Sequence, residues 1–458
     1  PSLEELVLKM EVELPEVDFS FWYRTANPQS YKMNKSCAQY PDPFDLQLHN
    51  FYWQTLVNGN VTFQLYAAYL DKRAAVESPR GVVRILATAN QIGNEFPATH
   101  CQLWYADHQE PILVLISEYI SVWPRVWNIK PLLSYPHLLS CPIPDELPFQ
   151  LHDATPRTVS LTAQVCDRAS NSLRVHYNLQ AVPNTINSQA SESTLSFGVC
   201  IKAFQFPFVD VSQRLIEWFE LQRLLGTSRI YAYEYDVLPA VQRVLDYYQS
   251  TGYLELRPLT MANGAPSLRH YLHSLIQNRL LVKRLNELIP FNDCFYRNMY
   301  RHDYMVNVDV DEVIMPLGEL HNWQQVADAV LQNKTSKCPN GYNAMCFTNS
   351  QFSDHNDPDE LFFLQNTMRL RNYSAQNQAI KCFHNARYSL TLHNHYTLQT
   401  LPGSCTFQFV DTSLAHMQHY FRKIKNATLR EMVEDHSIAK YATELRAAVR
   451  QVLIKLDE

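Results

Sequence analysis

Glycine is scarce in this sequence and accounts for only 10 of 458 residues, whereas globular proteins average about 7%. No two glycines have the spacing of G-x-G-x-x-G, G-x-x-x-x-G-K-S/T or G-x-S-x-G. A Rossmann dinucleotide loop, a Walker A loop and a nucleophile elbow are therefore excluded. If the protein binds a phosphorylated ligand, something other than a glycine-rich loop has to hold the phosphates.

A surplus of positive charge and a long apolar run are also missing. The chain has 39 Lys and Arg against 45 Asp and Glu, a net charge of -6, which disfavours nucleic acid and anionic membranes as partners. The longest apolar stretch, 111–123, is interrupted by Glu118 and is shorter than the roughly 20 residues of a membrane span. We therefore expect small molecules or neutral polymers as partners.

None of the ten cysteines forms a C-x-x-C pair, which disfavours a zinc ribbon and a thioredoxin motif. Buried free thiols and up to five disulfides both remain open. The chain starts at Pro1 without an initiator methionine, and we expect that any targeting segment has been removed. Five N-x-S/T sequons favour the secretory pathway, where disulfides form; they begin at Asn34, Asn60, Asn333, Asn372 and Asn426.

The first part of the chain contains short β-branched and aromatic runs separated by proline-containing turns. This spacing predicts an all-β, sandwich-like N-terminal domain over residues 1–190. A polar stretch, Pro183–Thr194, marks the expected domain boundary. Strands are expected at Val82–Ala87, Cys101–Tyr105, Ile112–Ile116, Thr158–Val165 and Leu173–Tyr177.

Beyond this boundary, strands and helices alternate. The alternation predicts an α/β domain over residues 191–458, with a mostly parallel sheet, helices on both faces and a C-terminal helix. Ligands of such sheets bind beyond the carboxyl ends of the strands. Strands are expected at Leu195–Phe204, Arg229–Tyr235, Tyr253–Leu256 and Tyr304–Val308, and helices from Ser212 to Gly226, from Pro239 to Gly252 and from Ser267 to Leu288.

The fourth of these strands runs directly into two aspartates, Asp309 and Asp311. Because side chains alternate along an extended chain, both carboxylates are expected on one face. Two such oxygen donors suit Mn²⁺ or Mg²⁺ with open coordination positions. The cation can neutralise a diphosphate and so replace the missing glycine loop. A solvated acidic turn is the alternative interpretation.

An ordered set of short motifs resembles glycosyltransferase family 92, once called domain of unknown function 23. The resemblance covers roughly residues 196–420 and leaves the N-terminal region unassigned. The set comprises Val199-Cys-Ile-Lys-Ala-Phe204, Glu217-Trp-Phe-Glu220, Arg223-Leu-Leu-Gly226, Ile230-Tyr-Ala-Tyr233, Asn292-Asp-Cys294, Tyr296-Arg297 and the run from Asp309-Val-Asp-Glu312 to Pro316.

The resemblance implies a GT-A fold, a Rossmann-like nucleotide-sugar-binding domain whose D-x-D motif holds Mn²⁺ against a UDP-sugar diphosphate. It implies an inverting enzyme that forms β1,4 links by moving galactose from UDP-galactose to a fucose or galactose of an N-glycan. With the sequons and cysteines, it implies the Golgi lumen and a type II membrane protein that contacts the membrane only through a removed N-terminal anchor. A homodimer is compatible with this picture.

The resemblance also implies roles for particular side chains. A downstream histidine often completes the metal shell of such folds, and here His393 is the candidate and His395 the alternate. An inverting transfer needs a general base for the acceptor hydroxyl; Asp354 and Asp357 are the first candidates, with Asp359 and Glu360 as alternatives. Basic side chains expected to contact the nucleotide or its diphosphate, each of which also fits a solvated surface charge, are Lys202, Arg297, Lys381 and Arg387.

Two other functions remain open at this stage. The segment Val308-Asp-Val-Asp-Glu-Val-Ile314 also fits the motif of haloacid-dehalogenase-type phosphatases, in which Asp309 would be the phosphorylated nucleophile and Asp311 the acid or base. That motif ordinarily opens its domain, whereas three βα units precede it here. The other hypothesis is a non-catalytic glycan-binding protein in which the β-rich domain binds the glycan.

Overall fold

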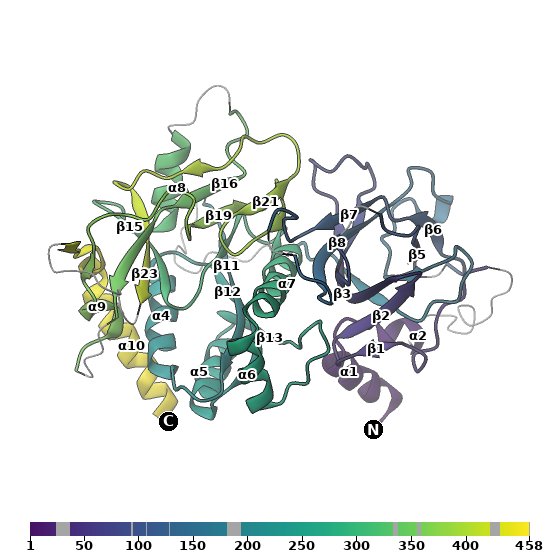
Figure 1. Cartoon of the computed structure of the whole chain (residues 1–458), viewed down its shortest axis with the longest axis horizontal. Helices are drawn as coiled ribbons and strands as arrows, with labels where there is room; N and C mark the ends of the chain where they lie inside the picture. Colours follow the sequence, from purple (N-terminus) through teal and green to yellow (C-terminus); the bar gives the residue numbers. More distant parts are fainter. Residues whose placement is uncertain are drawn as a thin grey trace. The chain divides into compact units, whose positions relative to one another are not determined.

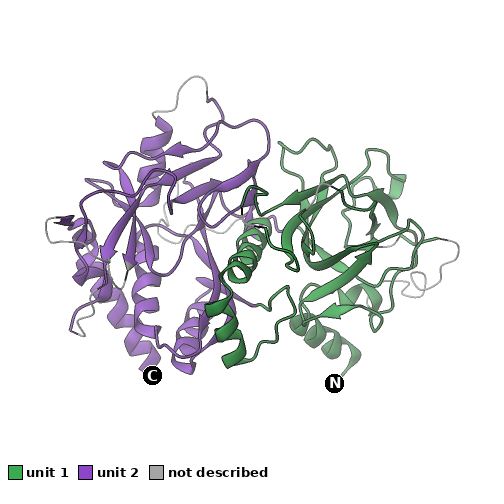
Figure 2. Ribbon diagram, in the orientation of Figure 1, with its two compact units in different colours: residues 1–177, 259–297 green, residues 178–258, 298–458 purple. Residues whose placement is uncertain are grey.

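The computed structural model describes residues 1–23, 37–92, 95–106, 108–127, 129–180, 194–332, 338–354, 359–421 and 431–457. The protein is a mixed α/β protein that divides into two compact units (Figures 1 and 2). Unit 1 comprises Pro1–Tyr177 and Leu259–Arg297, and unit 2 comprises Asn178–Pro258 and Asn298–Glu458. The polar boundary expected at Pro183–Thr194 lies, except for Thr194, outside the described residues.

Unit 1 is built on a ten-stranded sheet whose main path runs β6-β5-β9-β10-β3-β4-β8-β7, with β2 beside β3 and β1 beside β2. Its described pairings are antiparallel, except that β10 and β3 are parallel. The five strands expected here are confirmed, with small differences at their ends. The strands are β1 (Leu48–His49), β2 (Trp53–Asn58), β3 (Val61–Asp71), β4 (Val82–Ala89), β5 (His100–Trp104), β6 (Ile112–Leu115), β7 (Glu118–Ser121), β8 (Tyr135–Pro142), β9 (Thr158–Thr162) and β10 (Leu173–His176).

Unit 1 also contains helices, unlike the all-β domain expected from the sequence. Near the N-terminus are α1 (Leu3–Glu13) and α2 (Phe19–Tyr23), and a 3-10 turn, η1, spans Phe149–Leu151. Ser2 and Glu5 form a capping box at the start of α1. The sequence therefore contains a local start signal for α1. The strand-rich pattern that follows it led to the all-β prediction.

Two helices from the second half of the chain complete unit 1, namely α6 (Arg269–Asn278) and α7 (Leu280–Asn298). We expected one helix here, but the backbone of Arg279, with φ -118° and ψ 67°, interrupts it. The segment belongs to unit 1 because its partners are there: the indole Nε1 of Trp53 donates to the Thr260 carbonyl (3.1 Å), and the Tyr69 hydroxyl bonds to the Asp293 carboxylate. The units are thus not the two continuous segments that the sequence suggested.

The main sheet of unit 2 has seven strands in the order β13-β12-β11-β14-β19-β16-β22. The first four run parallel, as expected, whereas β19 is antiparallel to both β14 and β16. The sheet is therefore mixed. Its strands are β11 (Phe197–Phe206), β12 (Arg229–Val237), β13 (Leu254–Pro258), β14 (Tyr304–Asn307), β16 (Ala344–Phe347), β19 (Lys381–Asn385) and β22 (Gln408–Phe409).

Helices α4 (Ser212–Leu224) and α5 (Pro239–Ser250) connect the first three parallel strands, and the C-terminal helix α10 (Ala442–Asp457) packs against both (Figure 1). Helix α4 ends where predicted, because Gly226 takes a left-handed backbone with φ +99°. The remaining helices are α8 (Trp323–Gln332), α9 (Phe362–Gln365) and the 3-10 segment η3 (Ser437–Tyr441). Helix α9 forms from a short apolar run, a pattern that does not by itself distinguish strand from helix.

A second, five-stranded sheet of unit 2 has the order β15-β23-β17-β18-β24, and β20 and β21 form a separate pair. These shorter strands were not expected from the sequence. They are β15 (Glu312–Pro316), β17 (Asn349–Ser353), β18 (Met368–Leu370), β20 (Ser389–Leu392), β21 (Thr397–Thr400), β23 (Ala415–Phe421) and β24 (Met432–Glu434).

Disulfides are present within both units. The disulfide hypothesis is therefore confirmed, and the alternative of buried free thiols is not. No cysteine in the described part of the chain is a free thiol. Among the described residues, no helix has the length and apolarity needed to cross a membrane. Of the sequon asparagines, Asn60 and Asn372 are exposed, and the other three lie outside the described residues. The disulfides within the units are Cys37–Cys166 and Cys101–Cys141 in unit 1 and Cys338–Cys405 and Cys346–Cys382 in unit 2.

Candidate functional site

The two predicted aspartates lie where the chain passes from one sheet of unit 2 to the other. Strand β14 ends at Asn307 and β15 begins at Glu312. The backbone N–H of Glu312 donates to the Asp309 carbonyl (3.0 Å), and the N–H of Asp309 donates to Oε2 of Glu312 (2.8 Å). These bonds close a turn over 309–312, so the extended chain that we expected to carry both aspartates ends before it reaches them.

Asp309 is the more buried of the two aspartates. Its side chain is 15% exposed, against 42% for Asp311. Nζ of Lys202, on β11, lies 3.1 Å from Oδ1 of Asp309, and Nζ of Lys381, on β19, lies 3.7 Å from Oδ2. Burial by itself would raise the pKa of Asp309, but the two ammonium charges outweigh it and hold that pKa well below its usual range. The structure thus brings two of the predicted basic residues to the first aspartate.

Sequence reasoning gave no role to a second buried carboxylate, Glu312, or to His419. Oε2 of Glu312 lies 2.9 Å from Nζ of Lys381, and burial raises the pKa of Glu312 against the effect of this ammonium. His419, on β23, stands opposite Glu312 in the strand pairing. Its Nδ1 lies 3.7 Å from Oε1 of Glu312, and its Nε2 lies 3.7 Å from Oδ2 of Asp311. Only the pairing of β15 with a strand far along the chain reveals this neighbourhood.

The segment that carries the predicted metal-shell histidines also reaches the cluster. Nδ2 of Asn307 donates to the carbonyl of His393 (3.2 Å). Nζ of Lys381 donates to Oδ1 of Asn394 (2.6 Å). Because Lys381 also contacts Asp309, the histidine segment and the first aspartate share one buried cationic partner.

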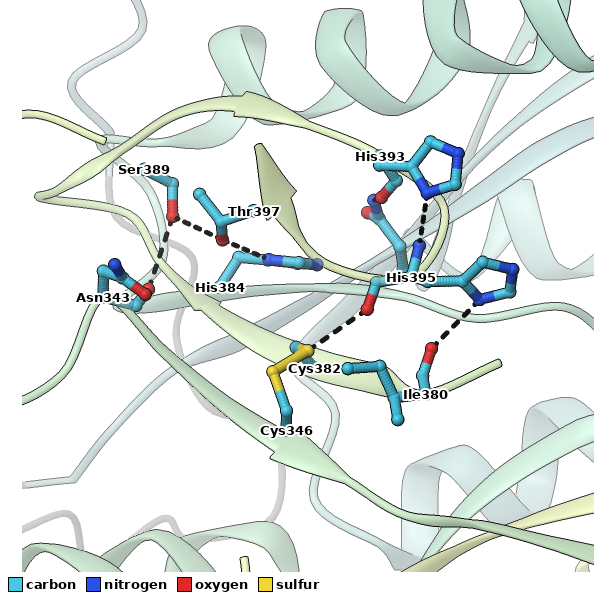
Figure 3. Close-up of a disulfide and its surroundings, with 10 residues drawn as sticks. Asn343, Cys346, Ile380, Cys382, His384, Ser389, His393, His395 and Thr397 are labelled. Atoms are coloured by element: carbon cyan, nitrogen blue, oxygen red, sulfur yellow. Dashed lines mark hydrogen bonds between the residues drawn. A yellow bond between two sulfur atoms is a disulfide. The ribbon is translucent and has the colours of Figure 1, made fainter. Parts of the chain in front are cut away.

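The hydrogen bonds of the two histidines distinguish them (Figure 3). Nδ1 of His395 lies 3.1 Å from the Ile380 carbonyl, which can only accept, so the proton is on Nδ1 and the lone pair is on Nε2. In His393, by contrast, Nδ1 accepts from the His395 N–H (3.3 Å), which puts the proton of a neutral ring on Nε2. Burial and the Lys381 charge lower the pKa of His395 to about 4. The alternate candidate, His395, therefore has the tautomer of a metal-ligating histidine whose second nitrogen donates to a carbonyl.

The candidate base Asp354 directly follows the C-terminal end of β17, a strand of the five-stranded sheet that also contains His419. Strands β17 and β23 run parallel, with Gln351 opposite His419. Asp354 is three residues beyond Gln351, so it leaves the sheet roughly 10 Å further along the strand direction than His419. Oδ2 of Asp354 lies 3.8 Å from a guanidinium nitrogen of Arg214 on α4.

The other acidic candidates lie further from the described cluster or cannot be placed. Asp357 lies outside the described residues. Asp359 is exposed in a turn. Oε2 of Glu360 accepts from Arg446 of α10 (2.6 Å), so this carboxylate already has a cationic partner. Among these candidates, Asp354 has the best-supported position.

Two of the predicted basic residues do not join the cluster. Arg387 is exposed in the turn between β19 and β20. Arg297 is buried in unit 1, where Nε lies 2.8 Å from Oδ1 of Asp293 and a second nitrogen contacts Glu16. The expectation that Arg297 contacts the nucleotide therefore lacks structural support, because its guanidinium already has two carboxylate partners.

The side chains of the cluster match a divalent cation in their chemistry. Within the described ranges, no set of three His, Cys, Asp or Glu side chains lies close enough together to hold a metal ion as the side chains stand. Oδ1 of Asp309 is a buried oxygen that receives no well-directed hydrogen bond from the described residues, although Lys202 lies near it. A hard cation is a suitable partner for such an oxygen. Two carboxylates and a neutral imidazole suit Mn²⁺.

Comparison with known families assigns the region that contains this cluster. Residues 196–451, more than half of the chain, match a family described as glycosyltransferase family 92. The chain belongs to glycosyltransferase family 92. The matched region of this family 92 protein extends from β11 into α10 and includes every residue of the cluster. No curated protein matches the chain significantly.

Membership in family 92 makes the protein a glycosyltransferase, which uses a sugar donor and a glycan acceptor. The resemblance drawn from the short motifs is therefore confirmed. The phosphatase alternative depended on the spacing of Asp309 and Asp311 alone, whereas the family match covers both residues and describes a glycosyltransferase.

Proposed function

We propose that this family 92 glycosyltransferase is a Mn²⁺-dependent, inverting enzyme that transfers galactose from UDP-galactose to a fucose or galactose of a glycan, forming a β1,4 link. The observation that carries the proposal is the contact of Asp309 with Lys202 and Lys381, together with the bond from Lys381 to Asn394, which lies between the two candidate histidines. Galactose, inversion and the β1,4 link follow from the resemblance to the family. A GT-A arrangement is supported by the strand order β13-β12-β11-β14.

Asp309, Asp311 and His395 are the residues that would hold the cation, with His393 as the second imidazole candidate. When bound, the cation neutralises the negative charge that develops on the departing diphosphate. Lys202 has a side chain that is 29% exposed, and its flexible stem lets the ammonium turn from Asp309 toward a phosphate oxygen. Lys381 is fully buried beside the carboxylates of Asp309 and Glu312, so it is less suited than Lys202 to reach a phosphate.

Asp354 is the proposed general base. It takes the proton of the acceptor hydroxyl as that oxygen bonds to the anomeric carbon and the bond from this carbon to the diphosphate breaks. Arg214 holds the Asp354 carboxylate from the α4 side. Asp357 is the second candidate for this role. The glycosidic bond is therefore made on one face of the sugar while the nucleotide leaves from the other.

We also propose the Golgi lumen as the location of this activity. The disulfides of both units and the exposed sequon asparagines Asn60 and Asn372 support an oxidising secretory compartment. The same compartment supplies nucleotide sugars and glycan acceptors.

The direct test is to incubate the protein with a panel of UDP-sugars, Mn²⁺ and fucosylated or galactosylated glycans. We expect transfer from UDP-galactose, and a loss of more than about tenfold in kcat/KM for Asp311→Ala. Asp246→Ala, which removes an exposed carboxylate of α5, is the control and should behave as wild type. Hydrolysis of phosphate monoesters without sugar transfer, or full transfer by Asp311→Ala, would contradict the proposal.

A further inference from the structure

The buried ammonium of Lys381 has more than one anionic partner, and the distribution of its contacts determines how strongly it interacts with Asp309. Its ammonium is fully buried, so water does not solvate it. Nζ lies 2.6 Å from Oδ1 of Asn394, 2.9 Å from Oε2 of Glu312 and 3.7 Å from Oδ2 of Asp309. The nearer of its two carboxylate partners is therefore Glu312, not the predicted metal-binding Asp309.

Glu312 is held in this position from several sides. Its Oε2 accepts the N–H of Asp309 (2.8 Å), its Oε1 faces Nδ1 of His419, and its own carbonyl accepts Nε1 of Trp218 (2.9 Å). The side chain is only 2% exposed. A carboxylate fixed in this way holds the Lys381 ammonium at a defined distance from Asp309.

A buried ammonium needs an anionic partner, because an unpaired charge is costly in the protein interior. If the charge of Glu312 is removed, Asp309 becomes the carboxylate within reach of Lys381 in the described structure. The ammonium would then close on Asp309 and oppose any cation that approaches the same oxygens. Lys202 does not replace Lys381 in this respect, because its side chain is partly exposed and water can solvate it when it moves away.

We propose that Glu312 is a positioning residue that draws Lys381 away from Asp309 and so keeps the Asp309 carboxylate available to a divalent cation. This inference rests on the proposed cation dependence of the enzyme and adds a residue that touches neither the sugar nor the nucleotide. Glu312 acts through Lys381. The effect of Glu312 on cation binding should therefore depend on the presence of the Lys381 ammonium.

Binding of Mn²⁺ to the whole chain without nucleotide tests the proposal, with free Mn²⁺ measured by electron paramagnetic resonance. We expect Glu312→Gln, which keeps the size and an acceptor oxygen, to raise the Mn²⁺ dissociation constant about tenfold. In the double variant Glu312→Gln/Lys381→Met, the competing ammonium is gone, and affinity should return to within about threefold of wild type. Lys440→Met is the matched control, because this unit 2 lysine donates to backbone carbonyls and its loss should leave affinity unchanged.

The single variant Lys381→Met keeps the proposal testable if Glu312→Gln does not fold. Removal of a positive charge beside Asp309 should make Mn²⁺ bind at least as tightly as in wild type, whereas a purely structural role of the pair predicts weaker binding. Circular dichroism and thermal unfolding report the folding of each variant.

Three outcomes overturn the inference. One is wild-type Mn²⁺ affinity in Glu312→Gln, and another is a loss in Glu312→Gln that Lys381→Met does not restore. In both cases the cation dependence of the enzyme stands. If the wild-type chain itself binds no Mn²⁺ at millimolar concentration, the proposed cation dependence falls first, and the role of Glu312 falls with it.

Discussion

Cys346 and Cys382 face each other across the antiparallel strands β16 and β19 and are joined by a disulfide. Cys382 directly follows Lys381 in the chain, and its Sγ lies 3.3 Å from the carbonyl oxygen of His395 (Figure 3). Both cysteines are fully buried. The disulfide therefore supports β19 at the place where this strand carries the buried lysine of the site and contacts the histidine segment.

Removal of this disulfide by Cys346→Ala/Cys382→Ala should weaken the binding of UDP with Mn²⁺ by about tenfold, or about 1.4 kcal/mol, because the segment that carries the proposed ligand His395 loses its contact with Cys382. The free energy of unfolding should fall by about 2–4 kcal/mol. Calorimetry and chemical denaturation measure the two effects. The control is Cys338→Ala/Cys405→Ala, which removes another disulfide of unit 2 and should lower stability alone. Equal losses of affinity in both variants would contradict a specific role.

Lys202 contacts Asp309 in the absence of ligand and is proposed to contact the diphosphate in its presence. Lys202→Met should therefore weaken UDP binding in the presence of Mn²⁺ by about tenfold. The free energy of unfolding should change by less than about 1 kcal/mol, because a partly exposed ion pair contributes little to stability. Titration calorimetry with UDP is the measurement, and unchanged affinity would remove Lys202 from the nucleotide site.

Arg297 is the buried centre of a charged network in unit 1, with Asp293 and Glu16 as its partners. Arg297→Met leaves two buried carboxylates without their cation and should lower the free energy of unfolding by about 3–5 kcal/mol. Arg168→Met is the control, because the pair of Arg168 with Asp45 is exposed on both sides, and it should cost less than about 1 kcal/mol. Similar unfolding midpoints for the two variants in urea would refute the assignment.

Glu217, a buried carboxyl group on α4, is expected to make the free energy of unfolding depend on pH. Burial raises its pKa to about 7, and the nearby Glu360 charge adds to this, although the N–H of Phe363 (3.4 Å) and the Arg214 charge act to lower the pKa. Because the pKa is higher in the folded state, this contribution is fully present below about pH 4.5, the ordinary value, and is lost as the pH rises through 7. Glu217→Gln should therefore gain roughly 3 kcal/mol relative to wild type between pH 4.5 and pH 8. Unfolding at a series of pH values measures this difference, and parallel curves would contradict it.

The sequence predicted the parallel strands β11, β12, β13 and β14 and the position of Asp309 directly after the last of them, because each signal is local, but it did not predict the turn over 309–312. Each signal spans only a few neighbouring residues, whether it is an apolar run, the glycine after α4 or the pair of aspartates. The order of the motifs also predicted the family, which the match over 196–451 confirms.

Features that depend on distant pairing were not predictable in the same way. His419 lies beside Glu312 only because β23 pairs with β15. The choice between His393 and His395 depends on which nitrogen faces the Ile380 carbonyl, and no spacing in the sequence contains that information. Arg297 follows the motif order of the family, yet its partners, Asp293 and Glu16, lie inside unit 1.

The assignment of α7 to unit 1 has a consequence for dissecting the chain. The family region, 196–451, includes this helix, whereas Tyr69, which bonds to Asp293 and stacks on Tyr296 of α7, precedes that region. A chain cut before residue 178 would leave both side chains of α7 without this partner. The family region is therefore expected to be less stable when it is produced alone than it is within the whole chain.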